Sequence, residues 1–404
     1  MCVIVAGCFL AFCRGLSQRG GLAFRRERGV ALLALAVALS LQGSAPAAEA
    51  WPLKPAVAGK GRLVVVEGVP VLHLYGTPGD MGQQEGQLLG PAYRELMKSY
   101  LVPFAGGQLP AMRRIAPKLV PFIPPEHLAE LRAFAAAAGE AEEDVLLTNT
   151  FLDLLGAAQC SVAIATGEAT GGTTLFARNL DFPSYNVAHK AALVTVYHPA
   201  ARERHSFAAV GWPGMFGALS GMNDAGVCVA TLVSFSEKGV QPGMPYAMMY
   251  RQALDRCATA DEVVRLVKAT PRTCANNLAV ADAKGGALVI EFTPKAVAVR
   301  EAKDGVVLVT NHFRSLAPAP STPPCERFEE LQRRTRQAHG HIGSAELKAM
   351  LKAVQMTEPK DRSTTLQSMI FEPATRRLHL AIGRLPAPEG EYVTLDCARL
   401  FKEE

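Results

Sequence analysis

The sequence predicts a protein of mixed α and β structure, with a mainly helical first part and a strand-rich second part. Residues 51–159 contain helical patterns interrupted by glycine and proline, whereas the chain after Cys160 contains short apolar β runs separated by turns. Strands interspersed with helices are typical of layered sheets with helices outside. The composition, with 49% hydrophobic and 20% charged residues, is that of an ordinary globular domain and excludes a disordered or coiled-coil chain.

The first fifty residues, 1–50, have the pattern of a leader with a secretory signal. A basic stretch, Arg25–Arg28, precedes the apolar run Val30–Leu41, and small residues at A-x-A spacing follow as far as Ala50. This order is typical of a signal for export, and the apolar run is shorter than the ~20 residues of a membrane helix. We therefore expect a periplasmic or secreted protein with no stable membrane span once the signal is removed.

Neither nucleic acid nor a cofactor is an expected partner. The net charge of +5 belongs in part to the arginine-rich leader, and no block of Lys and Arg with interleaved aromatic residues occurs. The chain has no C-x-x-C pair, no H-E-x-x-H motif, no G-x-S-x-G motif and no phosphate-binding glycine loop. We therefore expect neither a metal ion nor a cofactor. The sequence leaves a homo-oligomer open.

The first part of the chain is expected to begin with strands and to continue as helices. Arg62–Leu74 is an extended run with a central turn. Asp80 can then cap a long helix, and further helical patterns occupy Pro110–Ala138 and Glu140–Leu155.

The second part combines strands and helices. The segments that predict strands are Ala192–Tyr197, Ser206–Val210, Ala218–Met222, Val227–Val233, Leu278–Asp282, Leu288–Phe292 and Val306–Thr310. The helical patterns between or after them are Pro245–Arg256, Ala260–Ala269, Cys325–Arg336 and Ser344–Val354.

A β-hairpin is predicted directly after Cys160. Two apolar runs, Ser161–Ala165 and Leu175–Ala177, flank a turn rich in glycine and threonine. A hairpin folds back on itself, so the end of its second strand lies near the start of its first. Arg178 and Asp181 are therefore expected within reach of the Cys160 sulfur.

Cys160 has the features of a nucleophile whose base is its own amine. A cysteine needs an adjacent cation or base to react near neutral pH, and Arg178 could supply the cation. The nearest downstream histidine, His189, lies beyond the hairpin. If the bond between Gln159 and Cys160 were broken, the new α-amine would have a pKa of about 7.7–8.0 and could accept the thiol proton. Asp181 would then hold the ammonium in place.

Several segments, taken in order, resemble a known family. They are LYGTPGDMGQQEGQLLG (Leu74–Gly90), Cys160-Ser161, RNLDF (Arg178–Phe182), GMNDAGV (Gly221–Val227), NNLAVADAKG (Asn276–Gly285), VTNHF (Val309–Phe313), CERFEEL with Arg327, and TTLQSMIFEPATRRLHLAIG near the end. Together they resemble the acyl-coenzyme A:6-aminopenicillanic acid acyltransferase family of cysteine N-terminal-nucleophile hydrolases, with choloylglycine hydrolases and acid ceramidase as more distant relatives.

The resemblance implies an α+β fold, the four-layer αββα sandwich of N-terminal-nucleophile hydrolases, and a processing step. Self-cleavage between Gln159 and Cys160 would leave residues 51–159 as a mainly helical small chain. This chain would be a partner of the catalytic domain, residues 160–404.

The resemblance also implies a set of catalytic residues: Cys160, Arg178, Asp181, Asn223, Asn311 and Arg327. Asn223 and Asn311 would stabilise the oxyanion, and Arg327 would be a second active-site arginine. The Asn-Asp-x-Gly sequence at Asn223 is equally that of an ordinary hairpin turn.

We therefore expect an exported, self-processing amidohydrolase or acyltransferase that acts on a small-molecule N-acyl amide through a thioester on Cys160. Hydrolysis is the first choice, because water is plentiful outside the cytoplasm and coenzyme A is not. Two alternatives stay open. One is an uncut Cys/His thiol hydrolase with His189 or His312 as base, and the other is a non-catalytic envelope binding protein with the same fold.

Overall fold

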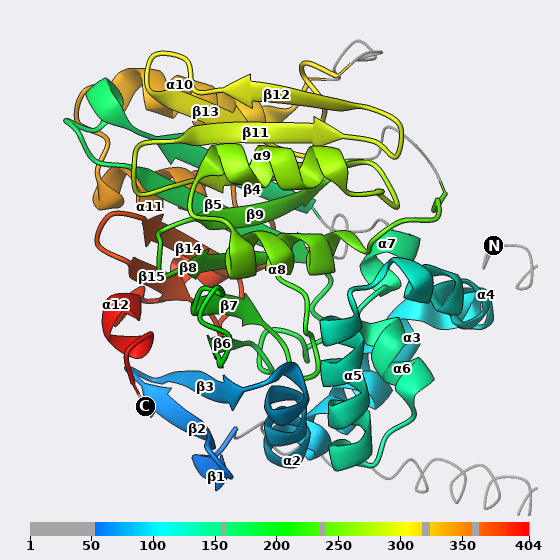
Figure 1. Ribbon diagram of the computed structural model, residues 1–404. Helices are drawn as coiled ribbons and strands as arrows, with labels where there is room; N and C mark the ends of the chain where they lie inside the picture. The colour runs from blue at the N-terminus through cyan, green and yellow to red at the C-terminus, as the bar shows by residue number, and fades with distance from the viewer. Residues whose placement is uncertain (1–52, 156–158, 235–238, 317–323, 358–362, 404) are drawn as a thin grey trace, which may run out of the picture. The chain divides into compact units, whose positions relative to one another are not determined.

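The computed structural model of the protein describes residues 53–155, 159–234, 239–316, 324–357 and 363–403. These residues contain helices and two β-sheets (Figure 1). The predicted leader, residues 1–50, lies outside them. Among the described residues, none of the helices has both the length and the hydropathy of a membrane span.

The first sheet joins the N-terminal strands to the strand-rich second part of the chain. Within the described residues it has ten strands, in the order β1 (Ala56–Ala58), β2 (Gly61–Val66), β3 (Val69–Gly76), β6 (Leu193–Pro199), β7 (Phe207–Gly211), β8 (Ser220–Asn223), β9 (Cys228–Val233), β10 (Asn276–Ala281), β11 (Ala287–Phe292) and β12 (Val297–Glu301). Neighbouring strands are antiparallel except β3 and β6, which are parallel. The strands predicted for this part of the chain are therefore confirmed, and β1 and β12 are additions to them.

The second sheet carries the predicted hairpin at its centre. Its six described strands are, in order, β13 (Val306–Val309), β4 (Gln159–Ala165), β5 (Leu175–Phe182), β14 (Thr364–Glu372), β15 (Arg377–Ala381) and β16 (Val393–Asp396). β4 and β5 are antiparallel, with Cys160 opposite Leu180 and Val162 opposite Arg178. Directly opposed residues share a face of the sheet, so Cys160 and Arg178 project from the same side.

Helices cover the outer face of each sheet. On the first sheet, α8 (Tyr246–Arg256) packs on β8 and β9, and α9 (Ala260–Ala269) packs on β10 and β11. On the second sheet, α10 (Glu326–Ala338) packs on β13 and β4, and α11 (Ser344–Ala353) packs on β5 and β14. The two inner faces meet where β4 contacts β9 and β11 contacts β13. The expected αββα order is confirmed, and a short helix, α12 (Cys397–Leu400), follows the last strand.

The segment before Cys160 is mainly helical, as predicted. Its α-helices are α2 (Pro78–Leu96), α3 (Val102–Ala105), α4 (Leu109–Ile115), α5 (Pro125–Ala138), α6 (Glu142–Thr148) and α7 (Phe151–Leu155). The cap of α2 differs from the prediction, because Thr77 is the N-cap and Asp80 is the third helical residue. The Thr77 side chain accepts the Asp80 N–H while the Asp80 carboxylate accepts the Thr77 N–H, which is a capping box.

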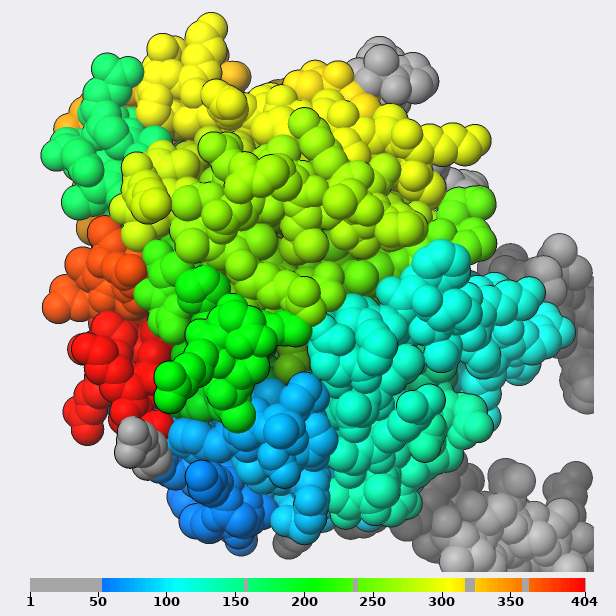
Figure 2. All heavy atoms as spheres, in the orientation of Figure 1, coloured from blue at the N-terminus to red at the C-terminus, as the bar shows by residue number. Residues whose placement is uncertain are grey.

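Buried polar contacts attach this helical segment to the rest of the chain. Glu130 of α5 pairs with Arg251 of α8 at 2.6 Å, and both side chains are buried. The Asp153 carboxylate of α7 accepts the backbone N–H of Tyr246, at the start of α8, at 3.1 Å. Figure 2 shows the blue and cyan surface of the segment lying directly against the green elements. Separating a buried ion pair leaves an uncompensated charge, so these contacts favour continued association.

The glycines of α2 allow a close approach to α5. Gly82, Gly86 and Gly90 recur every four residues and therefore share one face of the helix. A Cβ atom at Gly82 would lie 2.1 Å from the carbonyl oxygen of Glu130, and one at Gly86 would lie 2.7 Å from that of Phe134. The repeat of glycine in this motif therefore has a packing cause.

We expect Gly82→Ala to destabilise the fold, because the added methyl group has to displace the α5 backbone. Overpacking of this kind costs about 1–3 kcal/mol, and the thermal midpoint of unfolding measures it. Gly79→Ala is the control, since its Cβ meets no atom closer than the Thr77 hydroxyl oxygen at 3.9 Å. Equal midpoints for the two variants would contradict the close contact.

Candidate active site

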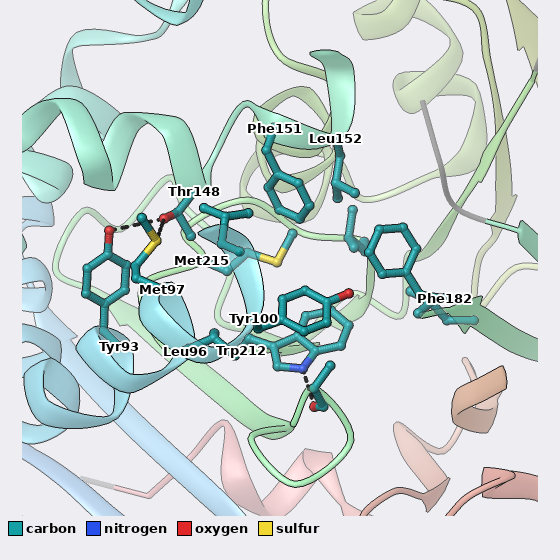
Figure 3. A pocket seen from close by; sticks show the side chains of 14 residues that line it. Tyr93, Leu96, Met97, Tyr100, Thr148, Phe151, Leu152, Phe182, Trp212 and Met215 are labelled. Carbon is teal, nitrogen blue, oxygen red and sulfur yellow. Dashed lines mark hydrogen bonds between the residues drawn. The ribbon is translucent and has the colours of Figure 1, made fainter. Parts of the chain in front are cut away.

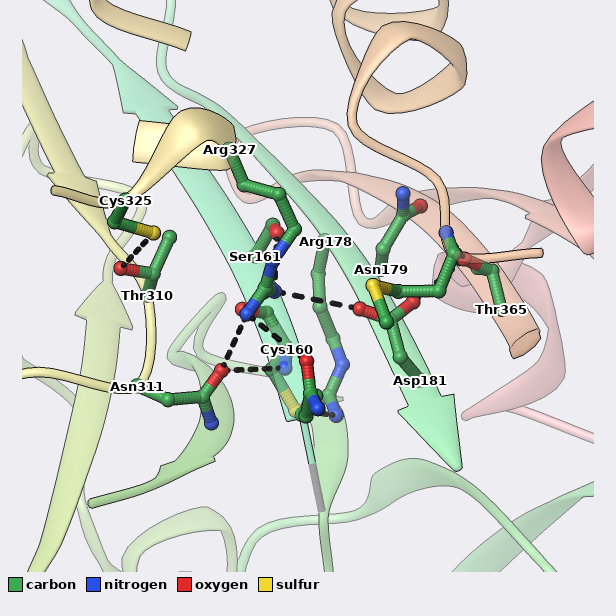
Figure 4. Close-up of polar contacts among 12 residues, drawn as sticks. Cys160, Ser161, Arg178, Asn179, Asp181, Thr310, Asn311, Cys325, Arg327 and Thr365 are labelled. Atoms are coloured by element: carbon green, nitrogen blue, oxygen red, sulfur yellow. Dashed lines mark hydrogen bonds and ion pairs between the residues drawn. The ribbon is translucent and has the colours of Figure 1, made fainter. Parts of the chain in front are cut away.

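Cys160 is the second residue of β4, and its side chain is fully buried between the two sheets. Arg178 of β5 donates from Nη2 to the Cys160 sulfur at 3.4 Å (Figure 4). Burial raises the pKa of the Cys160 thiol, and the charge of Arg178 opposes that rise. The predicted contact between this arginine and this sulfur is therefore present in the structure.

The Arg178 guanidinium is itself fully buried. Its Nη1 donates to the carbonyl oxygens of Leu219 at 2.8 Å and Thr231 at 3.3 Å. Thr231 lies in β9 of the first sheet, and Leu219 immediately precedes β8 of the same sheet. Arg178 therefore bridges the gap between the two sheets. Burial lowers the pKa of Arg178, and the carbonyl dipoles help to keep its charge beside the sulfur.

Asp181 lies on the opposite face of the second sheet, because it is one residue out of phase with Leu180. Its carboxylate accepts a hydrogen bond from the Thr365 hydroxyl at 2.5 Å and an ion-pair contact from Arg327 at 3.4 Å. Burial raises the pKa of Asp181 to about 6, although both partners act to lower it. Asp181 thus lies opposite Gln159 of β4, and its carboxylate is closer to the Thr365 hydroxyl than to Arg327.

Arg327, in the first turn of α10, holds the backbone of Cys160. Its Nη1 donates to the Cys160 carbonyl oxygen at 2.6 Å and to the Ser161 hydroxyl at 2.9 Å. Its Nη2 donates to the Asn311 side-chain oxygen at 3.1 Å. Figure 4 shows Arg327, Asn311 and Asp181 arranged around the start of β4.

Asn311 faces Cys160 with its oxygen rather than with its N–H group. Oδ1 accepts from the Cys160 backbone N–H at 2.9 Å and from Arg327, whereas Nδ2 donates to the Val233 carbonyl at 2.8 Å. Two donors on one side and a carbonyl on the other fix this orientation. The predicted role as an oxyanion donor therefore does not match the geometry, which is that of an acceptor for the nitrogen of Cys160.

The structure does not bring Asn223 to this cluster. Its amide nitrogen donates to the carbonyls of Leu254 at 2.8 Å and Cys257 at 2.7 Å, and its oxygen accepts the Val227 N–H at 2.8 Å. The side chain thereby closes the turn between β8 and β9 and ties it to the end of α8. The turn interpretation of this asparagine is correct, and the predicted oxyanion role is not supported.

No histidine of the described residues hydrogen-bonds to the Cys160 sulfur. The His189 ring nitrogen Nδ1 is paired with the Ser184 hydroxyl at 2.8 Å. His312 follows Asn311 in the chain, and burial lowers its pKa. The described residues also contain no group of three His, Cys, Asp or Glu side chains that could hold a metal ion.

An apolar pocket lies beside Cys160 (Figure 3). Its lining residues are Tyr93, Leu96, Met97, Tyr100, Leu101, Thr148, Phe151, Leu152, Leu180, Phe182, Ala188, Trp212, Met215 and Leu219. Leu180 is the residue directly opposite Cys160, and Leu219 provides a carbonyl to Arg178. The pocket therefore adjoins the site, and both the helical segment and the second part of the chain form its wall.

The polar atoms of this wall are already hydrogen-bonded within the protein. The Tyr100 hydroxyl donates to the Pro183 carbonyl at 2.8 Å, and the Trp212 ring N–H donates to the Ala188 carbonyl at 2.6 Å. The interior of the pocket consequently offers apolar surface to an occupant.

Sequence reasoning missed Thr365 and the pocket residues. Thr365 lies in a recognised segment, but its contact with Asp181 follows from the pairing of β14 with β5. The pocket brings together helices separated by about 50 residues, and only apolar periodicity in the sequence hints at them. The carbonyls that hold Arg178 carry no sequence signal at all.

The chain is similar over part of its length to curated proteins of other organisms. It is 28% identical to Protein dcd1B of Dictyostelium discoideum over 239 residues, covering 52% of this chain and 48% of that protein. It is 25% identical to an uncharacterized protein of Archaeoglobus fulgidus over 301 residues, covering 60% of this chain and 50% of that protein. The chain thus spans about half the length of these relatives.

Solved structures of modest similarity also match. The Caenorhabditis elegans ortholog of N-acylethanolamine-hydrolyzing acid amidase is 14% identical, with 53% of this chain and 93% of that chain covered and a TM-score of 0.42. Penicillin V acylase from Agrobacterium tumefaciens is 14% identical, with 55% and 83% covered and a TM-score of 0.42. The C2A mutant of conjugated bile acid hydrolase from Clostridium perfringens is 15% identical, with 60% and 95% covered and a TM-score of 0.43.

A family model provides the firmer assignment. The model of acyl-coenzyme A:6-aminopenicillanic acid acyl-transferase matches residues 168–385, which is more than half of the chain. The matched range contains Arg178, Asp181, Asn311 and Arg327. The chain therefore belongs to the acyl-coenzyme A:6-aminopenicillanic acid acyl-transferase family, as the order of its motifs predicts.

Proposed function

We propose that the protein is a self-processing cysteine amidohydrolase or acyltransferase of the N-terminal-nucleophile type, acting on linear N-acyl amides. The observation that carries the proposal is the position of Cys160: its sulfur contacts Arg178 while its own backbone N–H is held by the Asn311 oxygen. A nucleophile with a cation on one side and an acceptor at its nitrogen suits catalysis by the α-amine. Family membership supports this reaction class.

Self-cleavage begins when the Cys160 sulfur attacks the carbonyl carbon of Gln159. The new carbon–sulfur bond forms, the carbon–nitrogen bond between the two residues breaks, and the thiol proton ends on the released nitrogen. Water then breaks the thioester, which leaves a carboxylate on Gln159 and restores the thiol. Arg327 and Asn311 support this step because they hold the carbonyl oxygen and the nitrogen of Cys160.

In turnover, the α-amine of Cys160 accepts the thiol proton, and the thiolate attacks the carbonyl carbon of the substrate amide. The carbon–nitrogen bond of the substrate breaks, and the amine leaves with that proton. Water or a second amine then takes the acyl group from the thioester and returns a proton to the sulfur. Arg178 favours the thiolate, and Asn311 accepts from the amine. Hydrolysis is the favoured outcome for an exported protein.

The apolar pocket supports an apolar acyl group as the part of the substrate that is recognised. Leu180 and Phe182 mark its end near Cys160, and Figure 3 places Tyr93, Met97 and Thr148 at the other end. Each methylene buried there contributes about 0.8 kcal/mol to binding. The helical segment forms much of the wall, so the small chain stays part of the active enzyme after cleavage.

We expect the exported wild-type protein to consist of two fragments, the larger beginning at Cys160, and Cys160→Ala to remain a single chain. The variant lacks the attacking sulfur, so the Gln159–Cys160 bond has no nucleophile. Intact mass under reducing and denaturing conditions measures both. Cys228→Ala is the control, because this second buried cysteine lies in β9 outside the site. An unbroken wild-type chain would move the assignment to a Cys/His hydrolase or a binding protein.

The pH dependence of self-cleavage should respond to the charge at position 178. Arg178 lowers the pKa of Cys160, so Arg178→Gln raises it, and the increase in cleavage rate with pH shifts to higher pH. Arg178→Lys keeps the charge and should shift the profile less. The rates are measured by intact mass after precursor from inclusion bodies is refolded at a series of pH values. Superimposable profiles for the Gln and Lys variants would contradict the electrostatic role.

The length of the acyl group should be limited by the far end of the pocket. Met97→Trp fills that end, so we expect KM for a decanoyl anilide to rise about tenfold, equal to the loss of roughly two buried methylenes. KM for a short-chain substrate, a butyryl anilide, should stay within about twofold of the wild-type value. Leu128→Trp adds the same ring in a separate hollow of the helical segment and serves as the control. A uniform loss for both substrates would argue against this pocket as the acyl site.

A further inference from the structure

The segment that carries Asn311 has no regular secondary structure of its own. It follows β13 and comprises residues 310–316, here called the Asn311 segment. A loop depends on other groups for the hydrogen bonds of its backbone. Because the Asn311 oxygen must stay on the nitrogen of Cys160, the groups that hold this segment bear on the site.

The buried carboxylate of Glu291, in β11, collects the backbone N–H groups of this segment. Its oxygens accept from the N–H of Arg314 at 2.9 and 3.0 Å, of Ser315 at 2.8 Å and of Leu316 at 2.9 Å. The Arg300 side chain adds a contact at 3.5 Å. Successive N–H groups that converge on one anion form a concave binding site. A single side chain thus fixes the C-terminal half of the Asn311 segment.

The neighbouring strand holds the other end of the segment. Asn277 of β10 is directly opposite Glu291, so the two side chains share a face of the sheet. The Asn277 side-chain nitrogen donates to the Thr310 carbonyl at 3.1 Å. Thr310 immediately precedes Asn311. The adjacent buried side chains of Asn277 and Glu291 therefore hold the segment by hydrogen bonds on both sides of Asn311.

The same segment also contacts the helix that carries Arg327. The Arg314 guanidinium stacks on the ring of Phe328, with its central carbon 3.3 Å from the ring centroid. Phe328 follows Arg327 in α10. Asn311 and Arg327 share a hydrogen bond at 3.1 Å, so a displacement of the segment moves both groups that hold Cys160.

We propose that Glu291 and Asn277 are positioning residues of the active site. They orient the Asn311 oxygen on the nitrogen of Cys160 and, through the Asn311 segment, the Arg327 guanidinium on its carbonyl oxygen. The inference rests on the proposed function for its catalytic consequence. A buried carboxylate is costly unless several donors surround it, and a neutral side chain would fill the same space at lower cost. The hydrogen bonds from the Asn311 segment to the Glu291 carboxylate explain why a charged side chain is buried at this position.

The test compares Glu291→Gln with a matched control, Asp282→Asn. Asp282 is a second buried carboxylate that holds three backbone N–H groups, those of Ala260, Lys284 and Gly286. It follows the end of β10 remote from Asn277. Both variants replace one acceptor by a donor that faces N–H groups, so both should lower the thermal midpoint by similar amounts.

Only Glu291→Gln should lower the reaction rates. We expect the rate of self-cleavage and kcat for the butyryl anilide to fall about 10- to 100-fold, because a displacement of catalytic groups by about 1 Å can reduce a rate by this factor. KM should stay within about twofold, and Asp282→Asn should keep the rates of the wild type. Hydrogen exchange at residues 314–316 should accelerate in Glu291→Gln alone. Equal rates in the two variants, at matched stability, would overturn the inference.

Asn277→Ala provides an independent measurement if Glu291→Gln fails to fold. It removes the donor to Thr310, and we expect a smaller loss of kcat, about tenfold, again with little change in KM. An unchanged kcat in this variant would also overturn the inference. A wild-type chain that neither cuts itself nor hydrolyses the anilide would instead contradict the proposed function, so the two failures are distinguished by the wild type.

Discussion

The contact between the Arg178 guanidinium and the Cys160 sulfur places a charge in the gap between two sheets, and much of the fold serves to satisfy that charge. The guanidinium is held by the carbonyl of Leu219, just before β8, and by that of Thr231 in β9 of the first sheet. The backbone of Arg178 lies in β5 of the second sheet. A buried charge is tolerated only with such partners. The packing of β4 against β9 therefore fixes both the separation of the sheets and the environment of the thiol.

The alternation of side chains along β4 and β5 divides the site into two chemical compartments. The inner face carries Cys160 and Arg178, next to an apolar pocket, and the outer face carries Asp181 under α10. The strand itself separates them, and Arg327 and Asn311 reach its backbone from the outer side and from the end. Cys160 can thus face an apolar pocket while polar groups hold the nitrogen and carbonyl of the same residue.

The sequence allowed prediction of those parts of the site that depend on local structure. The hairpin, and with it the proximity of Arg178 to Cys160, follows from alternation and a glycine turn. Arg327 could be assigned only by resemblance, because its place depends on how α10 packs on the second sheet. The sequence could not decide the role of Asn223, since a turn asparagine and an oxyanion asparagine have the same sequence context. Thr365 and Glu291 escaped notice because their partners are set by strand register and by loop path.

In the proposed mechanism, the hydrogen bond between Asn311 and the nitrogen of Cys160 would connect processing to catalysis. In the uncut chain this nitrogen is an amide with one hydrogen, and the Asn311 oxygen already accepts it. Cleavage would convert it into an amine, which can donate to the same oxygen and also take a proton from the sulfur. Burial raises the pKa of the thiol, so a base that appears only after cleavage suits this cysteine. In this proposal, the site that holds the peptide nitrogen of Cys160 would also hold the catalytic amine.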